Sequence, residues 1–279
     1  MGTSTSSSGG KAGSPFDPEW LDQGDGSATG TGPGDGATDA GDSEGVPDGQ
    51  DGNAETAQEC DVAPDRRFMP ARAKLGKYLS GGGRDALRGA ASSMINKGMG
   101  GAARAARTMG GAAQGAGRLG EFLGAVRDGA TQQAIDWRQR VRGQNLSATD
   151  LALELIKEVL PDTGSMDEES LRNAASDALG QLYELDPNVD IFSLTDEQIA
   201  SVIGFTIGNE VCNRMDEQLG QTYEKLKYSP VQVQELRNDI REWVQGEVER
   251  IMEGLAGLRL DCQTLAQTVL TSALEVFAE

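Results

Sequence analysis

The sequence predicts an all-α protein, in which a C-terminal bundle of about five helices follows a Gly/Ala/Arg-rich, partly helical segment and a disordered acidic N-terminal tail. Three observations predict this fold class. In residues 144–279, apolar side chains recur at helical spacing behind N-cap signals. Strand signals are missing. The net charge is −13 in residues 1–65, +11 in residues 66–143 and −17 in residues 144–279. With residues 1–20 set apart as the tip of the tail, these changes predict four regions.

The tip carries an amine that a partner could use. Gly2 is small enough for a methionine aminopeptidase to remove Met1, which would leave the Gly2 amine free. An α-amino group has a pKa of about 7.7–8.0, so a fraction of it is uncharged and nucleophilic near neutral pH. Small residues behind it would let the end enter a narrow active site: Thr3, Ser4, Thr5 and Ser6. A frayed terminus has the same composition, so both interpretations stay open.

An aromatic cluster follows in the tip. Pro15 and Pro18 restrict the backbone around Phe16, Trp20 and Leu21. Aromatic side chains carry much of the binding energy of protein interfaces, so the cluster is typical of a docking motif. The alternative is an apolar island that occurs by chance. We therefore treat Phe16, Trp20 and Leu21 as candidate partner-binding residues.

Residues 21–65 are predicted to be a disordered acidic tether. They consist mainly of Gly, Asp, Ser, Thr and Ala, with almost no apolar side chains beyond Leu21, Val46 and Val62. Such a segment cannot bury enough apolar surface to offset its chain entropy, and its like charges keep it expanded.

The basic segment, residues 66–143, is rich in Gly, Ala and Arg. It predicts short helices that pack closely through small faces and break near Gly81–Gly83 and Gly110–Gly111, because each glycine costs helix stability. GxxxG spacings occur at Gly111/Gly115 and Gly120/Gly124, but arginines interrupt the run, so membrane insertion is not expected. The charge of +11 could bind nucleic acid. Balance inside the molecule or by an acidic partner is favoured, because acidic segments of the same chain would compete.

The acidic domain, residues 144–279, shows start signals for four of its five predicted helices. Four helices open at Ser147-x-x-Asp150, Ser165-x-x-Glu168, Thr195-x-x-Gln198 and Ser229-Pro230-x-Gln232, and a fifth covers roughly residues 260–278. Paired carboxylates stand in first helical turns, where they favour the helix dipole: Glu168/Glu169 and Asp196/Glu197. A capping role is therefore expected for them rather than acid–base catalysis.

The composition excludes several kinds of chemistry. The chain has no histidine, which excludes a Ser-His-Asp or Cys-His triad and an HExxH zinc site. Cys60, Cys212 and Cys262 are too far apart in sequence for a CxxC pair or zinc knuckle, and Cys212 is expected to be a buried thiol. We expect a soluble, cytoplasmic protein that is not an enzyme and has no cofactor or metal of its own, with neither a signal peptide nor a membrane span.

Four short motifs carry a resemblance to a known family. They read Met1-Gly2-Thr3-Ser4-Thr5-Ser6…Gly9-Gly10, Pro15…Pro18-x-Trp20, Leu75-Gly76-Lys77-Tyr78…Gly81-Gly82-Gly83-Arg84 and Leu160-Pro161-Asp162-Thr163-Gly164-Ser165-x-Asp167. Together they resemble the QatB family, the small non-enzymatic component of the QatABCD anti-phage defence system of bacteria. The family pattern has prolines where Lys11 and Glu19 stand in this chain.

The resemblance implies partners and a modification. The expected partner is a QueC-like enzyme, QatC, with an ATPase and a TatD-like nuclease from the same system. QueC-like enzymes of related systems join a deazaguanine base to an N-terminal glycine, using ATP and a 7-deazaguanine precursor. Gly2 would then be the acceptor amine, and Thr3 to Ser6 would lie in the enzyme's channel. Two other classes stay open: an adaptor that is N-myristoylated at Met1-Gly2-x-x-x-Ser6, and a nucleic-acid-binding protein.

Overall fold

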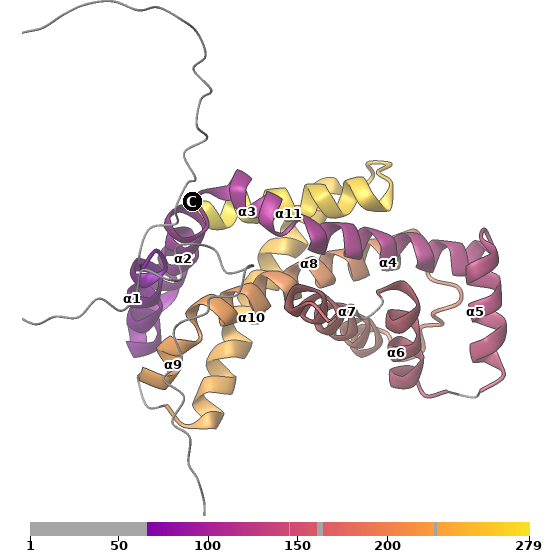
Figure 1. The fold of residues 1–279 in the computed structure, drawn as a ribbon, viewed down its shortest axis with the longest axis horizontal. Helices are drawn as coiled ribbons and strands as arrows, with labels where there is room; N and C mark the ends of the chain where they lie inside the picture. Colours follow the sequence, from indigo (N-terminus) through magenta and orange to yellow (C-terminus); the bar gives the residue numbers. More distant parts are fainter. Residues whose placement is uncertain (1–65, 145, 161–163, 226–227) are drawn as a thin grey trace, which may run out of the picture. The chain divides into compact units, whose positions relative to one another are not determined.

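A computed structural model describes residues 66–144, 146–160, 164–225 and 228–279 of the chain, and these form one compact unit (Figure 1). The described residues contain helices, turns and no strand, so the all-α prediction is confirmed for them. The predicted tip and tether lie outside the described residues.

The basic segment forms several helices that the glycines separate. In order they are α1 (Met69–Lys77), the π-helical turn η2 (Tyr78–Gly82), α2 (Gly83–Ser93), the π-helical turn η3 (Met94–Gly98), α3 (Ala102–Thr108), α4 (Gly110–Asp128) and α5 (Gln132–Arg142). The predicted break at Gly81–Gly83 is present, because Gly81 and Gly83 have φ of 91° and 69°. The second break comes one residue before Gly110, which opens α4. A further break at Gly100 and Gly101 was not predicted.

The acidic domain forms the five predicted helices and one short extra one. They are α6 (Ala148–Val159), α7 (Met166–Leu185), α8 (Asp196–Leu219), the short α9 (Gln221–Lys225), α10 (Pro230–Leu255) and α11 (Cys262–Ala278). Capping boxes are present at Thr195 and Ser229, as predicted. Ser165 is the N-cap of α7, so the helix start predicted there is confirmed, although the Ser165 side chain makes no capping hydrogen bond.

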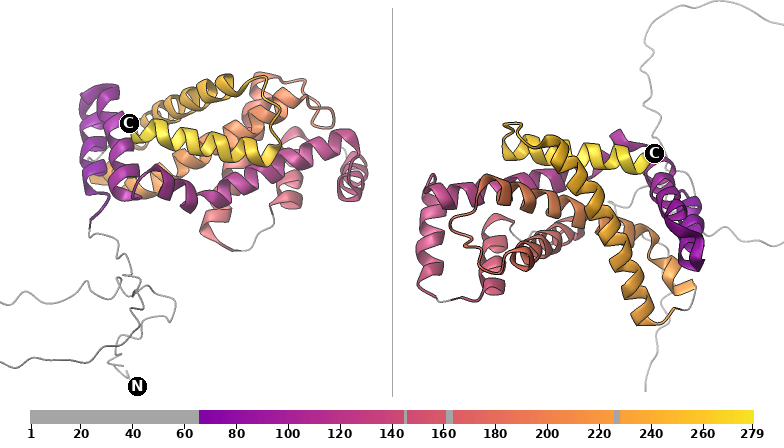
Figure 2. Two further views of the ribbon diagram at one scale, coloured as in Figure 1. Left: turned by 90° about the horizontal axis from the view of Figure 1, so that it is seen from above. Right: turned by 180° about the vertical axis from the view of Figure 1, so that it is seen from behind.

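The hydrophobic core is continuous from α1 to α11. Helix α8 packs against α7, α10, α4 and α11, and every residue from Val202 to Cys212 in it is buried. Figure 2 shows α11 lying along α4, although the two helices are far apart in the sequence. The change of charge at residues 143/144 therefore lies inside one packed unit.

Small residues let α4 approach its neighbours closely. A Cβ atom on Gly120 would lie 2.5 Å from the Cδ1 of Ile203 on α8, and one on Gly115 would overlap Leu171 on α7. Real side chains do not approach this closely, so a larger residue at either position would force the facing Ile203 or Leu171 side chain to shift. The predicted packing of small faces is confirmed here.

The last helix is held at its end by α2 and by the turn η3 that follows it. The carbonyl oxygen of Ala278 accepts hydrogen bonds from Ser92 Oγ at 2.8 Å and from Asn96 Nδ2 at 2.6 Å. These bonds satisfy a carbonyl group that the end of a helix leaves without a partner.

Candidate functional site

The residues that the sequence singled out for chemistry and docking all lie outside the described part of the chain. They are Gly2, Thr3, Ser4, Thr5, Ser6, Phe16, Trp20 and Leu21. Their roles stay predictions. The described residues offer other candidates, which are a basic surface, two pockets and a buried polar network.

The basic surface is carried by residues 66–98, here called the basic hairpin, which contain α1 and α2 packed side by side (Figure 1). It has eight basic side chains and one acidic side chain, Asp85. The basic residues are Arg66, Arg67, Arg72, Lys74, Lys77, Arg84, Arg88 and Lys97. All of these except Arg72 are exposed. The hairpin therefore presents a concentrated positive charge to a partner.

The basic helices after the hairpin are partly neutralised by the acidic domain. Arg127 on α4 pairs with Asp196 at 2.6 Å, and Arg140 on α5 pairs with Glu158 at 2.6 Å. These ion pairs support the predicted balance of charge inside the molecule. In the hairpin, Arg88 reaches Glu247 only at 3.9 Å. The hairpin's other exposed cations make no ion pair with any described residue, so they remain available.

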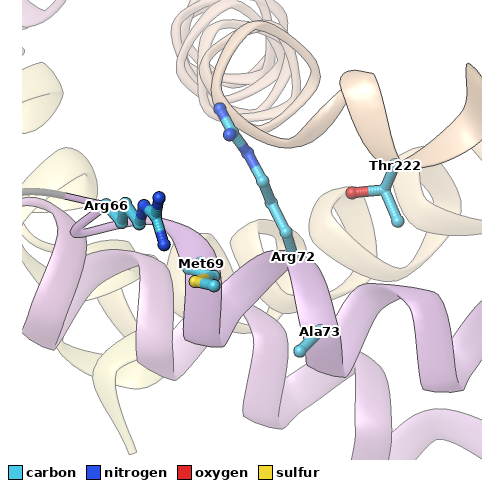
Figure 3. A pocket seen from close by; sticks show the side chains of 5 residues that line it. All are labelled: Arg66, Met69, Arg72, Ala73 and Thr222. Atoms are coloured by element: carbon cyan, nitrogen blue, oxygen red, sulfur yellow. The ribbon is translucent and has the colours of Figure 1, made fainter. Parts of the chain in front are cut away.

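A pocket of about 480 Å³ lies between α1 and α9, and we call it the α1–α9 pocket (Figure 3). Arg66, Met69, Arg72 and Ala73 line it from α1 and the turn before it, and Thr222 lines it from α9. The sequence contains no local signal for this pocket. Met69 and Ala73 share a helix face at i, i+4 spacing, but only the fold brings Thr222 beside them.

A second pocket, of about 580 Å³, lies where α2 meets α10 and α11. Trp243 and Phe277 form apolar walls, with their rings 5.1 Å apart. Its charges are mixed: Glu247 lies between Arg88 and Arg250, and Arg250 Nη1 is 2.6 Å from the carboxylate. Since the cations near Glu247 are shared with it, this pocket has less unused charge than the α1–α9 pocket.

A buried polar network joins α7 and α8. Glu210 is 2 % exposed and accepts a hydrogen bond from Ser170 Oγ at 2.7 Å, while Arg214 lies 4.0 Å away. Burial raises the pKa of Glu210 to about 7, and the bond from Ser170 and the charge of Arg214 oppose this rise. Nearby, Gln245 Nε2 donates to Asn209 Oδ1 at 2.8 Å. These groups link helices to one another.

The predicted roles of other polar residues can also be checked. Glu168, Glu169, Asp196 and Glu197 lie in first helical turns, as predicted, and Asp196 also pairs with Arg127. Cys212 is buried, as predicted, and desolvation raises the pKa of its thiol to about 12. Among the described residues, no three potential ligands are grouped for a metal ion. None of the described helices is long and apolar enough to cross a membrane.

By fold and surface, the described part of the chain is a helical protein whose candidate sites are suited to binding. Residues 100–277 match the family described as Qat anti-phage system associated protein QatB, and the chain belongs to this family. It is thus associated with an anti-phage defence system. No curated protein and no solved structure matched the chain. The basic hairpin and most of the α1–α9 pocket lie before the matched residues.

Proposed function

We propose that this chain is a non-catalytic defence component that binds a QueC-like enzyme, QatC, and presents its Gly2 amine to that enzyme for conjugation to a deazaguanine base. The observation that carries the proposal is membership of the QatB family. The composition supports it, because a chain without histidine has none of the common imidazole-based reaction centres.

The tail has a sequence suited to this role. Residues 21–65 have the composition of a flexible tether, and a chain of about 45 such residues spans tens of ångströms. Gly2 could then reach an active site while the helical unit stays bound elsewhere on the enzyme. The exposed cations of the basic hairpin supply charge for that second contact.

The proposed reaction is an amide synthesis that uses the partner's ATP. A carboxyl group of the deazaguanine precursor is activated by ATP as an acyl-adenylate, with release of pyrophosphate. The uncharged Gly2 amine attacks the acyl carbon, and AMP and a proton leave as the amide bond forms. No oxidation or reduction occurs, and the chain gains the mass of the precursor acid less one water.

Intact-mass spectrometry of the chain coexpressed with the QueC-like enzyme tests this reaction. We expect the mass gain on the peptide that begins at Gly2, and its loss when the enzyme is omitted. Gly2→Pro permits removal of Met1 but leaves a hindered secondary amine, so it should block the modification. Gly9→Ala is the matched control and should be modified normally. An end that is only free Gly2 or Met1 beside an active enzyme contradicts the proposal, and an added acyl chain supports the myristoylated alternative.

Nucleic-acid binding is a second candidate function, favoured by the exposed cations of the basic hairpin that make no ion pair with described residues. Contacts to phosphates release counterions, so the affinity for a labelled DNA duplex would fall steeply with salt. Fluorescence anisotropy of the full chain with and without Lys74→Glu, Lys77→Glu and Arg84→Glu measures this. Weak binding whose affinity does not change in these variants excludes nucleic-acid binding by the basic hairpin.

A further inference from the structure

The α1–α9 pocket holds two guanidinium groups that still have unused hydrogen-bond donors. The guanidinium of Arg66 makes no hydrogen bond or ion pair with any described residue. Arg72 donates from Nε to the carbonyl oxygen of Gln218 at 2.9 Å, which fixes its orientation and leaves its two terminal nitrogens for another acceptor. Figure 3 shows the side chain of Arg72 reaching from α1 toward the neighbouring helix. Guanidinium groups in fixed positions are well suited to a carboxylate.

An orphan hydroxyl group points to a ligand at the same place. Thr222 is 6 % exposed and lines the pocket, and its Oγ1 has no hydrogen-bond partner among the described residues. Figure 3 shows this hydroxyl directed to the side on which Arg72 lies. A buried hydroxyl without a partner costs about 1–3 kcal/mol, a cost that a ligand oxygen in the pocket would remove.

The backbone of the pocket favours an anion as well. Helix α1 begins at Met69 with no side-chain cap and no acidic residue in its first turn, so the partial positive charge of this end is not offset. Arg66 has φ of 59°, which makes it the single non-glycine residue with positive φ in the described part. This conformation is unfavourable for arginine, and such strain is concentrated at binding sites.

The remaining walls of the pocket are apolar. Met69 is 51 % exposed, and Ala73 is exposed on the same face of α1. A solvent-exposed Met beside two arginines is suited to a ligand that carries an apolar group next to its anionic group. A single-stranded nucleic acid fits this arrangement less well, because the pocket has no aromatic ring on which a base could stack.

We propose that the α1–α9 pocket binds an acidic side chain, with an adjacent apolar side chain, from a peptide segment of the QueC-like enzyme. The two guanidinium groups and the Thr222 hydroxyl hold the carboxylate, and Met69 and Ala73 contact the apolar neighbour. This inference rests on the proposed function, because that function names the partner.

Calorimetric titration of the full chain with the purified QueC-like enzyme tests the pocket. We expect Arg72→Glu and Arg66→Glu each to raise the Kd about tenfold or more. The matched control is Arg107→Glu on α3, an exposed arginine away from the pocket, which should change the Kd less than twofold. Wild-type affinity in both pocket variants overturns the proposal.

Thr222→Val supplies a readout that a purely structural role would not give. Valine has nearly the same shape as threonine and removes the orphan hydroxyl, so the melting temperature of the free chain should rise. The same change should weaken binding of the enzyme several-fold, because a hydrogen bond to the carboxylate is lost. Tighter or unchanged binding by this variant contradicts the pocket's assigned ligand.

A photo-crosslinking amino acid at position 69 identifies the occupant. The expected product joins it to an enzyme peptide in which Asp or Glu adjoins an apolar residue. Crosslinks to residues 1–65 of the chain itself, or to nucleic acid, overturn the assignment.

The Gly2 mass separates this inference from the proposed function. A complex that Arg72→Glu weakens while Gly2 stays unmodified supports the pocket and contradicts the modification. If Gly2 is modified and Arg72→Glu binds the enzyme with wild-type affinity, the modification is supported and the pocket's assigned ligand is contradicted. The absence of any complex overturns both.

Discussion

The carboxyl group of Glu210 is buried where α8 packs against α7. Desolvation raises its pKa to about 7, whereas an unfolded chain leaves a glutamate near about 4.3. At pH values between these two pKa values, Glu210 is protonated in the folded state and ionised in the unfolded state. The free energy of unfolding therefore falls as the pH rises through this range. The stabilising contribution is complete below about pH 4 and is lost as the pH passes through about 7.

Glu210→Gln removes this titration. We expect the variant to be more stable than the wild type at about pH 8, by up to about 3 kcal/mol, because each pKa unit corresponds to ~1.4 kcal/mol. The difference should shrink toward about pH 4.5. Urea unfolding followed by circular dichroism at several pH values measures it. Glu184→Gln, at an exposed position of α7, is the control, and a difference from wild type that is constant with pH would contradict the assignment.

At the residue scale, sequence reasoning succeeded where a residue's neighbours along one helix decide its environment. Cys212 lies in the apolar stripe of α8, so its burial could be predicted. The sequence did not predict contacts between residues that are far apart along the chain. Nothing near Thr222 in the sequence indicates Arg66 and Arg72, which only the packing of α1 against α9 brings to the same pocket.

The N-cap of α8 gives a prediction at the scale of the element. Thr195 Oγ1 accepts a hydrogen bond from Gln198 N at 3.2 Å, and Gln198 Oε1 accepts one from Thr195 N at 2.9 Å. Thr195→Ala should therefore cost about 1 kcal/mol in the free energy of unfolding. Ser165→Ala is the matched control, because the Ser165 side chain makes no capping bond, and it should cost much less. Equal costs in thermal unfolding would refute this account.

The contact of α4 with α8 gives a second prediction at this scale. Gly120→Ala places a Cβ 2.5 Å from Cδ1 of the fully buried Ile203, so the end of the Ile203 side chain would have to shift within the core. We expect a loss of about 1–3 kcal/mol. Gly180→Ala on α7 is the opposite case, because nothing lies within 4 Å of its added Cβ, and it should gain up to about 1 kcal/mol. Chemical denaturation of both variants measures their free energies of unfolding. A Gly120→Ala variant that is more stable than the wild type would contradict the close packing of α4 against α8.

Helices were predictable as elements because their signals are local. Start residues and apolar spacing located the helices of the acidic domain, down to the caps of α8 and α10. Ser165 is the N-cap of α7, as the sequence predicted. The sequence does not determine whether the Ser165 hydroxyl group forms a hydrogen bond with the backbone, and in the structure it does not cap the helix. The short α9 has too few residues for a periodic signal.

At the scale of the whole molecule, the shared core predicts one unfolding transition for residues 66–279. Trp137 on α5 and Trp243 on α10 report on the two sides of the charge boundary. In the Trp20→Phe background, Trp243→Phe leaves Trp137 as the reporter, and Trp137→Phe leaves Trp243. Within each variant, tryptophan fluorescence and far-ultraviolet circular dichroism should give the same urea midpoint. Two separated transitions would mean that the basic segment folds on its own.

The changes of charge along the sequence divide it into regions but do not indicate which regions pack together. Charge is a property of exposed side chains, whereas the core is built from buried ones, including the alanines and glycines of α4. Ion pairs such as Arg127 with Asp196 cross the boundary and reduce the electrostatic contrast there.

The place of α11 against α3 and α4 has a consequence for the timing of biosynthesis. A ribosome completes α4 long before α11, and at about 5–20 residues per second the delay is roughly eight to thirty seconds. During this interval the apolar faces of α3 and α4 lack the helix that covers them. Folding of the unit therefore finishes only after α11 has been synthesised and has left the ribosome, when Ala278 can reach Ser92 and Asn96.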